Sequence, residues 1–466
     1  MDILLTHGYY LYEDPHEREV MKPYPPLGLL YISSYLKAGG YDVGVFDSTF
    51  SSHDSFRQFI TREKPPVVGI YANLMTRPTV LEMLQFCRDQ GCLTILGGPD
   101  PANYAEEYLL RGANVVVIGE GELTLEQLLP HLVRHGASDM GHIPGIVYRE
   151  RDDHVVHTSP RPYLRDLDAQ PFPDRSAVDI HEYIRVWREH HGMGSVSLIT
   201  ARGCPYTCAW CSHAVFGYSH RRRSPHKVAD EVEYILETYR PDMLWYADDV
   251  FTIHPRWFFA YRDELRRRAI RIPFETISRE DRLDEEIVRS LAEMGCFRLW
   301  IGSESGSQQV LDAMQRRTDA SRVREMVHLL QNYGIQAGLF IMLGYEGETM
   351  ADLEATAEHL KAANPDLFLT TLAYPIKGTP YYEQVAERVI SLKPWDQGSD
   401  RDLTVAGRHS RRFYAFANRW LVSQLAWRQS RNGSAPNYRH LARAFVSAQL
   451  GRLGMRLTQH EVEVGD

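Results

Sequence analysis

Residues 202–211 read RGCPYTCAWC and place three cysteines, Cys204, Cys208 and Cys211, at the spacing C-x3-C-x2-C. Thiolates hold iron–sulfur clusters, and a cubane cluster normally takes four protein ligands. Three ligands this close together leave one iron free to bind a small molecule and to pass an electron to it. A structural zinc site is the alternative, because zinc takes four ligands and His213 is close enough in sequence to supply the fourth.

The cysteine spacing, with Trp210 between the second and third cysteines, resembles the radical S-adenosylmethionine (SAM) superfamily. The resemblance implies that the three cysteines hold a 4Fe-4S cluster as metal ligands, with no catalytic residue beyond them. It also implies that the free iron binds the amino and carboxylate groups of SAM, and that reductive cleavage gives a 5'-deoxyadenosyl radical. An external one-electron reductant of the flavodoxin or ferredoxin type is then expected as a partner. Trp210 is expected near the adenine of SAM.

The composition indicates an ordinary globular protein of two or three domains, with 466 residues, 44% hydrophobic and 24% charged. A net charge of -9 argues against a general nucleic-acid binder. The other cysteines, Cys87, Cys92 and Cys296, lie in apolar segments and are expected to be buried free thiols. A cluster site implies a reducing, cytoplasmic location. We expect neither a signal peptide nor a membrane span, since no apolar stretch approaches roughly 20 residues.

Residues 1–135 alternate short apolar runs with helical patterns, which predicts an α/β domain with a doubly wound, flavodoxin-like parallel sheet. Helices are expected at residues 27–38 and 79–90. The expected strands are Ile3–Thr6, Val43–Asp47, Val67–Tyr71, Thr94–Gly97 and Val115–Ile118. Ligands of such sheets bind beyond the carboxyl ends of the strands.

At those strand ends the sequence turns rich in glycine, which lets the backbone approach a ligand closely. Together with Pro25–Leu30, these turns resemble the N-terminal cobalamin-binding domain of cobalamin-dependent radical SAM enzymes, a family of protoporphyrin ester cyclases and methyltransferases. The resemblance implies that cobalamin contacts Gly97, Gly98, Gly119, Glu120 and Gly121. The chain lacks the Asp-x-His-x-x-Gly motif that supplies a histidine to cobalt in other corrinoid proteins. A domain that kept the fold and lost the cofactor is the alternative.

Residues 136–193 are predicted to be a connector with a hairpin around residues 151–153. Residues 194–385 show six strand–helix units, which predicts a partial (β/α)6 radical SAM barrel with its chemistry at the carboxyl ends of the strands. Residues 386–466 are predicted to form a helical C-terminal cap. Residues 401–466 hold 11 Arg and 4 Asp or Glu, either as a solvated basic face or as contacts for an anionic substrate or partner.

Several strand ends of the predicted barrel carry charged residues that the resemblance assigns to SAM. Asp248 or Asp249 would bind its ammonium group, Arg279 its carboxylate as a fork, and Glu304 its ribose hydroxyls. Capping of the next helix, a surface salt bridge and a plain turn are the respective alternatives.

Two further segments are less clear. Gly344 would lie near adenine, but the chain has Tyr345-Glu346 where the family commonly has Leu-Pro, which leaves that contact in doubt. The basic run 219–225 either receives an anionic group at the active mouth or forms a solvated loop.

The resemblance therefore predicts an enzyme that uses one cluster, SAM and cobalamin to functionalise an unactivated carbon of a small molecule. Methyl transfer is the main hypothesis, and radical cyclisation or rearrangement is the alternative. A non-catalytic iron–sulfur or corrinoid sensor is a third hypothesis, disfavoured because a sensor has no need of a complete SAM pocket.

Overall fold

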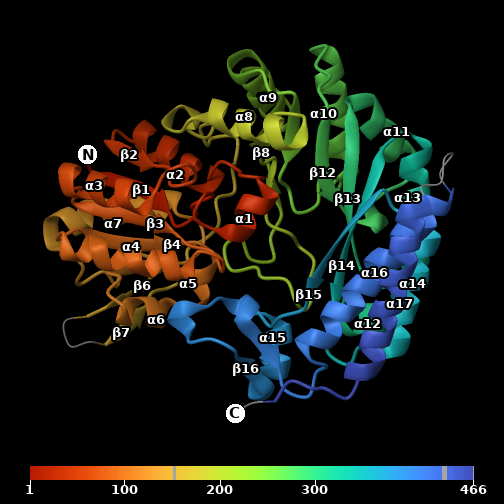
Figure 1. Ribbon diagram of the computed structural model, residues 1–466. Coiled ribbons are helices and arrows are strands. Elements are labelled where there is room, and N and C mark those ends of the chain that lie inside the picture. Colours follow the sequence, from red (N-terminus) through yellow and green to blue (C-terminus); the bar gives the residue numbers. More distant parts are fainter. Residues whose placement is uncertain (151–153, 433–437, 465–466) are drawn as a thin grey trace. The chain divides into compact units, whose positions relative to one another are not determined.

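The computed structural model describes residues 1–150, 154–432 and 438–464 (Figure 1). Two compact units are present. The first holds residues 1–205, 212–247 and 393–399, and the second holds residues 206–211, 248–392 and 400–466. The predicted domain bounds at 135, 193 and 385 do not coincide with these units and stay a prediction.

The first unit is built on a seven-stranded sheet of order β2-β1-β3-β4-β5-β6-β7. The first five strands are parallel, in the 2-1-3-4-5 order of flavodoxin-like folds, which confirms the predicted topology. The hairpin β6–β7 adds to its edge in antiparallel pairing, and the expected turn at residues 151–153 lies outside the described residues. The strands are β1 (Ile3–His7), β2 (Val43–Phe46), β3 (Val67–Tyr71), β4 (Leu93–Gly97), β5 (Val115–Val117), β6 (Ile146–Arg149) and β7 (Val155–His157).

Successive strand residues point to opposite faces, and each face has its own core. Ile3 and Leu5 of β1 pack with helices α2 (Leu27–Ala38) and α7 (Glu122–His135). Leu4, on the other face, packs in a core with α3 (His53–Glu63), α4 (Arg77–Asp89) and α6 (Ala105–Leu110). The short helix α5 (Pro99–Asn103) follows β4. Figure 1 shows helices covering both sides of the sheet, as in a doubly wound fold.

The rest of the first unit contains short elements and a parallel strand pair, β8 with β11. Helix α8 lies inside the predicted connector, where no helix was expected. A two-residue antiparallel ladder, β9 with β10, closes the loop that carries the cysteines. The elements are α1 (Pro15–Val20), η1 (Arg175–Ala177), α8 (Ile180–His191), β8 (Ser195–Leu198), β9 (Ala201–Arg202), β10 (Arg221–Arg222), α9 (Pro225–Tyr239) and β11 (Met243–Tyr246).

The second unit contains four parallel strands in the order β15-β14-β13-β12. Their helices begin at good N-caps: Asp284 caps α11, Asp319 caps α13, and Thr349 forms a capping box with Asp352 at α14. The elements are α10 (Pro255–Arg267), β12 (Phe274–Ser278), η2 (Glu280–Arg282), α11 (Glu285–Met294), β13 (Cys296–Glu304), α12 (Gln308–Ala313), α13 (Ala320–Asn332), β14 (Gln336–Leu343), α14 (Met350–Ala363) and β15 (Leu367–Leu372).

The C-terminal region ends in two long helices that pack together, α16 and α17. A side chain at Gly451 would meet the backbone nitrogen of Trp420 at 2.9 Å, so glycine permits this close approach. The elements are α15 (Pro380–Val385), η3 (Ala386–Arg388), β16 (Val389–Ser391), η4 (Trp395–Gln397), η5 (Asp400–Asp402), β17 (Leu403–Val405), α16 (Arg411–Asn432) and α17 (Tyr438–Thr458). Among the described residues, no helix is both long enough and apolar enough to cross a membrane.

Candidate functional site

The first unit contains a cavity at the carboxyl ends of β3, β4 and β5, closed on one side by α2 and α7. It encloses about 810 Å³ with its open mouth included. All five residues that the sequence predicted to contact cobalamin line it: Gly97, Gly98, Gly119, Glu120 and Gly121. The structure thus brings together turns that lie more than 20 residues apart.

The walls of this cavity fit a large, mainly apolar group. A Cβ atom added to Gly28 or to Gly97 would meet no protein atom within 4 Å, so both glycines keep space open. Gly98 has φ +107, and a side chain there would clash with the carbonyl of Ala72, so only glycine suits this turn. Leu29 and Leu125 are among the apolar lining residues. The cavity therefore has the open space and the apolar walls that the tail of a bound cobalamin would require.

His7, near the same end of the sheet, is committed to the protein. Its Nε2 lies 2.9 Å from Oδ1 of Asp47, and the hydroxyl of Ser48 lies 3.0 Å from its Nδ1. His7 does not line the cavity.

Buried charges stand at the rim of the cavity. Nη1 of Arg202 donates to Oε1 of Glu120 over 2.7 Å, and Nη2 donates to Glu122 over 2.6 Å. Burial alone would lower the pKa of Arg202, but the two carboxylates reverse this effect and raise it. Arg221 also binds Glu120, at 2.7 and 2.9 Å. The carboxylate of Glu120 is therefore satisfied by the protein although the residue lines the cavity.

The basic run 219–225 has neither of the roles expected from the sequence. Arg221 binds Glu120, and Arg223 forms an ion pair with Glu231 of α9. Arg223 is 4% exposed, so this is no solvated surface. The run does receive carboxylates, but they belong to the chain itself.

The cysteine loop spans residues 203–220, between β9 and β10. Cys204 and Cys208 are half-buried and Cys211 is exposed, and none of the three forms a disulfide. By contrast Cys87, Cys92 and Cys296 are buried free thiols, as predicted, and burial raises the pKa of Cys87 and Cys296 far above the usual range. The accessible trio therefore fits the donor set of a three-cysteine cluster.

Two further observations bear on the metal. Nδ1 of His213, the fourth ligand of the zinc alternative, lies 3.3 Å from the carbonyl of Gly217, and burial lowers the pKa of this imidazole. Within the described residues, no three His, Cys, Asp or Glu side chains stand close enough together to hold a metal ion. The assignment of the cysteines therefore rests on their spacing along the chain.

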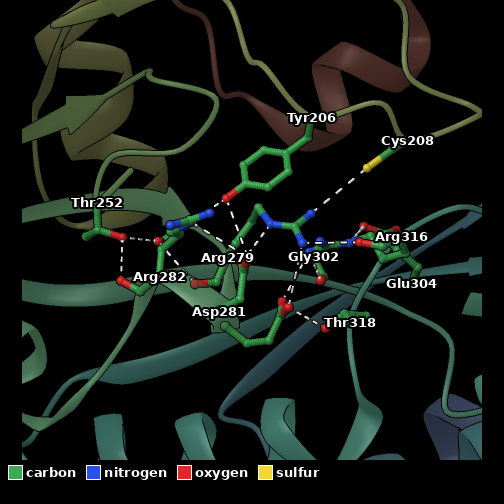
Figure 2. Close-up of polar contacts among 12 residues, drawn as sticks. Tyr206, Cys208, Thr252, Arg279, Asp281, Arg282, Gly302, Glu304, Arg316 and Thr318 are labelled. Carbon is green, nitrogen blue, oxygen red and sulfur yellow. Dashed lines mark hydrogen bonds and ion pairs between the residues drawn. The ribbon is translucent and has the colours of Figure 1, made fainter. Parts of the chain in front are cut away.

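A guanidinium in the second unit lies next to one of these thiols (Figure 2). Nη1 of Arg279 is 4.0 Å from Sγ of Cys208, and the guanidinium lies 3.9 Å from the centre of the Tyr206 ring. Nε of Arg279 donates to Asp281 over 2.8 Å, and Nη2 donates to the carbonyl of Arg316 over 3.1 Å. Arg279 is 4% exposed, which excludes the surface salt bridge considered for it.

Glu304 lies beside this group at the end of β13, in the left-handed region with φ +59. Such a conformation is uncommon outside glycine and typical of functional sites. Nε of Arg316 is 3.8 Å from Oε1 of Glu304. Burial raises the pKa of Glu304 to about 8, Glu280 adds to the rise and Arg279 opposes it. Buried carboxyl groups with a raised pKa are frequent at functional sites, so Glu304 is a candidate ligand-binding residue.

The other residues assigned to SAM lie apart from this group in sequence. Asp248 is buried and Asp249 exposed, and the N-cap of the next helix, α10, is His254, so neither aspartate caps that helix. Gly344 has φ +75 and donates its N–H to Glu348 over 2.6 Å. Trp210 packs against an apolar cluster that includes Tyr345. Tyr345 stands where the family commonly has leucine.

Sequence reasoning missed several charged residues at these two places. Glu280 and Arg316, 3.2 Å apart, lie beneath Arg279, and Tyr206 supports its guanidinium. The charged run 279–282, directly after a strand, was an available signal. Arg202 was also missed, because its partners are about 80 residues away in sequence.

Comparison with known proteins supplies the class. Residues 198–360 match the model of the radical SAM superfamily, and residues 18–129 match that of the B12 binding domain. The chain therefore combines a B12-binding domain with a radical SAM domain, and it is a cobalamin-type radical SAM enzyme. These domains imply a 4Fe-4S cluster, SAM and cobalamin as its cofactors, and radical SAM enzymes act on small-molecule substrates.

The chain is homologous to the magnesium-protoporphyrin cyclases and to cobalamin-dependent radical SAM methyltransferases. It is 28% identical to the anaerobic magnesium-protoporphyrin IX monomethyl ester cyclase of Rubrivivax gelatinosus, over 84% of this chain and 71% of the cyclase. It is 27% identical to the cytidylyl-2-hydroxyethylphosphonate methyltransferase of Streptomyces wedmorensis, over 76% of each chain. The solved structure of the cobalamin-dependent SAM radical enzyme OxsB superposes with a TM-score of 0.77 at 16% identity, covering 98% of this chain and 72% of OxsB. At that identity the superposition shows a shared fold.

Proposed function

We propose that this chain is a cobalamin-dependent radical SAM methyltransferase that methylates an unactivated carbon of a small molecule. The observation that carries the proposal is the presence, in one chain, of a glycine-lined apolar cavity in the B12-binding domain and a loop with three cysteines at the spacing C-x3-C-x2-C. The methyltransferase of Streptomyces wedmorensis, which aligns with three quarters of the chain, supports methyl transfer.

In this proposal Cys204, Cys208 and Cys211 hold three irons of the cluster, and cobalamin lies in the cavity at Gly97 and Gly119. When bound, the cluster supplies the electron that cleaves SAM, and cobalamin carries the methyl group. The fold contributes position and exclusion of water, since apolar walls keep reactive species from solvent. The electron comes from an external reductant of the flavodoxin or ferredoxin type.

SAM is proposed to bind at the second unit's charged group. Arg279 binds the SAM carboxylate as a fork, and its stacking on Tyr206 fixes the plane of the guanidinium. Asp249 binds the ammonium group and Glu304 a ribose hydroxyl. Trp210 and Gly344 lie toward adenine. Near-complete burial of Arg279 and Glu304, at 4% and 9% exposure, strengthens hydrogen bonds to a ligand in this place.

Radical cyclisation is the second candidate, because a ring-forming cyclase is the relative with which the chain shares 28% identity. Both candidates need the same cofactors, so the chain's own residues do not separate them. The products distinguish the two candidates. Methylation adds one CH2 group to the substrate and also converts SAM to S-adenosylhomocysteine.

The test is anaerobic turnover of the reconstituted enzyme with SAM, a chemical reductant and candidate substrates, followed by mass spectrometry. Methyl transfer predicts both 5'-deoxyadenosine and S-adenosylhomocysteine, and a product heavier by one CH2 group. Formation of 5'-deoxyadenosine without S-adenosylhomocysteine, under conditions in which a substrate is consumed, would rule out methyl transfer and favour cyclisation. Absence of any SAM cleavage would favour a sensor.

A further inference from the structure

The buried carboxylate of Glu120 connects the cavity of the first unit with the neck of the cysteine loop, which is the short ladder of β9 and β10. Glu120 lies in the glycine turn after β5, and its side chain is 5% exposed. It binds Arg202 of β9 and Arg221 of β10, which are register partners in the ladder that closes the loop. Its second oxygen also accepts the backbone N–H of Leu164 over 2.9 Å. Glu120 therefore holds both ends of residues 203–220 against the cavity rim.

The loop itself forms part of the cavity wall. Val215 and Phe216 line the cavity, and a Cβ atom on Gly119 would lie 3.6 Å from the carbonyl of Val215. The Phe216 ring lies 5.9 Å from the Arg202 guanidinium and 6.0 Å from that of Arg221. The loop leaves the first unit after Pro205 and returns to it at Ser212, so the wall and Cys204 share one neck.

The backbones of the two limbs of the loop also approach each other closely at the neck. Gly203 has φ +83, and a side chain there would clash with the carbonyl of Ser219 on the opposite limb. Nδ1 of His220 lies 3.1 Å from the carbonyl of Gly203. A loop closed this tightly transmits a displacement of one limb to the other, because packed elements move between discrete arrangements.

We propose that Glu120 couples occupation of the cavity by cobalamin to organisation of the cysteine loop, so that each cofactor tightens the binding of the other. The inference rests on the proposed function, since it takes cobalamin as the occupant of the cavity. Glu120 is a positioning residue, and its carboxylate acts through Arg202 and Arg221. By linkage, the factor by which the cluster tightens cobalamin must equal the factor by which cobalamin tightens the cluster.

A purely structural role for Glu120 predicts something different. Removing one member of a buried ion pair leaves an uncompensated charge and destabilises the fold. Such a loss lowers the stability of the protein and weakens cobalamin binding to the same extent with and without the cluster. Only a coupling role makes the effect of the substitution depend on the other cofactor.

The experiment measures hydroxocobalamin affinity of the full chain by absorbance titration, in the anaerobically reconstituted protein and in the same protein freed of its cluster. For the unchanged chain we expect affinity about tenfold higher with the cluster. In Glu120→Gln and in Arg221→Gln this ratio should fall below about twofold. Glu231→Gln is the matched control, because Glu231 is also a buried carboxylate between two arginines, Arg175 and Arg223, and does not line the cavity. It should keep the tenfold ratio.

A second readout needs no cluster. Alkylation of the loop thiols in the cluster-free protein should slow when hydroxocobalamin is added to the unchanged chain, and this protection should disappear in Arg221→Gln even if Glu120→Gln fails to fold. Equal cobalamin affinity with and without the cluster in the unchanged chain would overturn the coupling and leave the proposed function standing. Failure of the unchanged chain to bind cobalamin in either form would overturn both.

Discussion

The two units each bury a glutamate at the end of a strand, and the two glutamates are treated in opposite ways. Glu120 of the first unit accepts hydrogen bonds from two arginines and a backbone N–H, all within 2.9 Å. Glu304 of the second unit has Nε of Arg316 only at 3.8 Å, adopts a left-handed backbone, and its pKa is raised by burial to about 8. A carboxylate whose hydrogen bonds are all made within the protein has a structural role. A carboxyl group with few partners in the protein can still bind a ligand.

The largest effect is expected from a substitution that removes one of the cysteine ligands of the cluster. In Cys208→Ala we expect loss of the charge-transfer absorption of the reconstituted cluster and SAM cleavage at background, because two thiolates cannot hold a cubane. Iron content and 5'-deoxyadenosine formation are the measurements. Cys296→Ala is the control, since Cys296 is buried and free, and it should keep the cluster. SAM cleavage at the unchanged rate in Cys208→Ala would contradict the assignment.

The cavity is tested by filling it. Gly28 lies on α2 with open space around its Cβ position, so Gly28→Leu should weaken cobalamin binding roughly 10- to 100-fold by overlap with the cofactor. The same change should not lower the Tm, because leucine favours a helix over glycine by about 1 kcal/mol. Ala38→Leu adds a similar side chain at an exposed position of the same helix and should leave binding unchanged. Unchanged affinity in Gly28→Leu would place cobalamin elsewhere.

The under-compensated glutamate is tested by SAM binding. Above pH 8, where the carboxyl group of Glu304 is ionised, Glu304→Gln should weaken SAM binding about fivefold to tenfold, since a hydrogen bond to a charged acceptor is lost and a neutral one remains. Equilibrium dialysis with the reconstituted protein measures this. Glu122→Gln, which removes a buried carboxylate paired with Arg202 in the first unit, should leave SAM binding within about twofold. If the two variants lose SAM affinity equally, Glu304 has no specific role.

The last prediction concerns the pH dependence of stability and Glu348, a second buried carboxyl group of the second unit. Burial raises its pKa to about 8, Asp352 adds to the rise, and the Gly344 N–H and Arg408 oppose it. The folded state then keeps a proton that the unfolded state releases near pH 4.5. Stability should therefore fall as pH rises from about 5 to 8, by on the order of 1 kcal/mol per pH unit from this group.

Glu348→Gln should reduce that slope and leave the contribution of Glu304, whose pKa burial also raises to about 8. Thermal unfolding of the cluster-free protein between pH 5 and 8 measures the slope. Asp319→Asn is the control, because Asp319 is not among the groups that shift the pKa of Glu348. Hydrogen bonds from Ser321 lower the pKa of Asp319 in the folded state, so its contribution is lost only as the pH falls below this range, and the slope between pH 5 and 8 should stay as in the unchanged chain. An unaltered slope in Glu348→Gln would show that other groups set the pH dependence.

Local patterns in the sequence were enough for most of the fold. The bounds of α2 and β3 match the prediction because periodic apolar residues fill both elements. Helices α13 and α14 begin directly after the N-cap residues Asp319 and Thr349, which are recognisable in the sequence. Helix α8 was missed inside the expected connector although Ile180, Tyr183, Ile184 and Trp187 are at helical spacing and buried, because the turn residues just before it dominated the interpretation.

Some residues of the candidate site could likewise be predicted from the sequence, and others could not. The three cysteines and the glycine turns could be predicted, because their chemistry depends on spacing along the chain. The partners of Arg221 and Arg202 could not, since Glu120 lies 101 and 82 residues from them and pairing across that distance depends on how the sheet and the loop pack. The same holds for the raised pKa of Glu304, which follows from burial and from Glu280.

The central claim is that one chain holds both a cluster and cobalamin. The measurement that tests it most directly is anaerobic reconstitution with iron, sulfide and hydroxocobalamin, followed by desalting, metal analysis and an absorption spectrum. The account predicts about four irons and about one cobalamin retained per chain, with cobalamin alone lost in Gly28→Leu. A desalted protein with its cluster and without cobalamin would contradict the claim, and it would leave a radical SAM enzyme whose cavity serves another ligand.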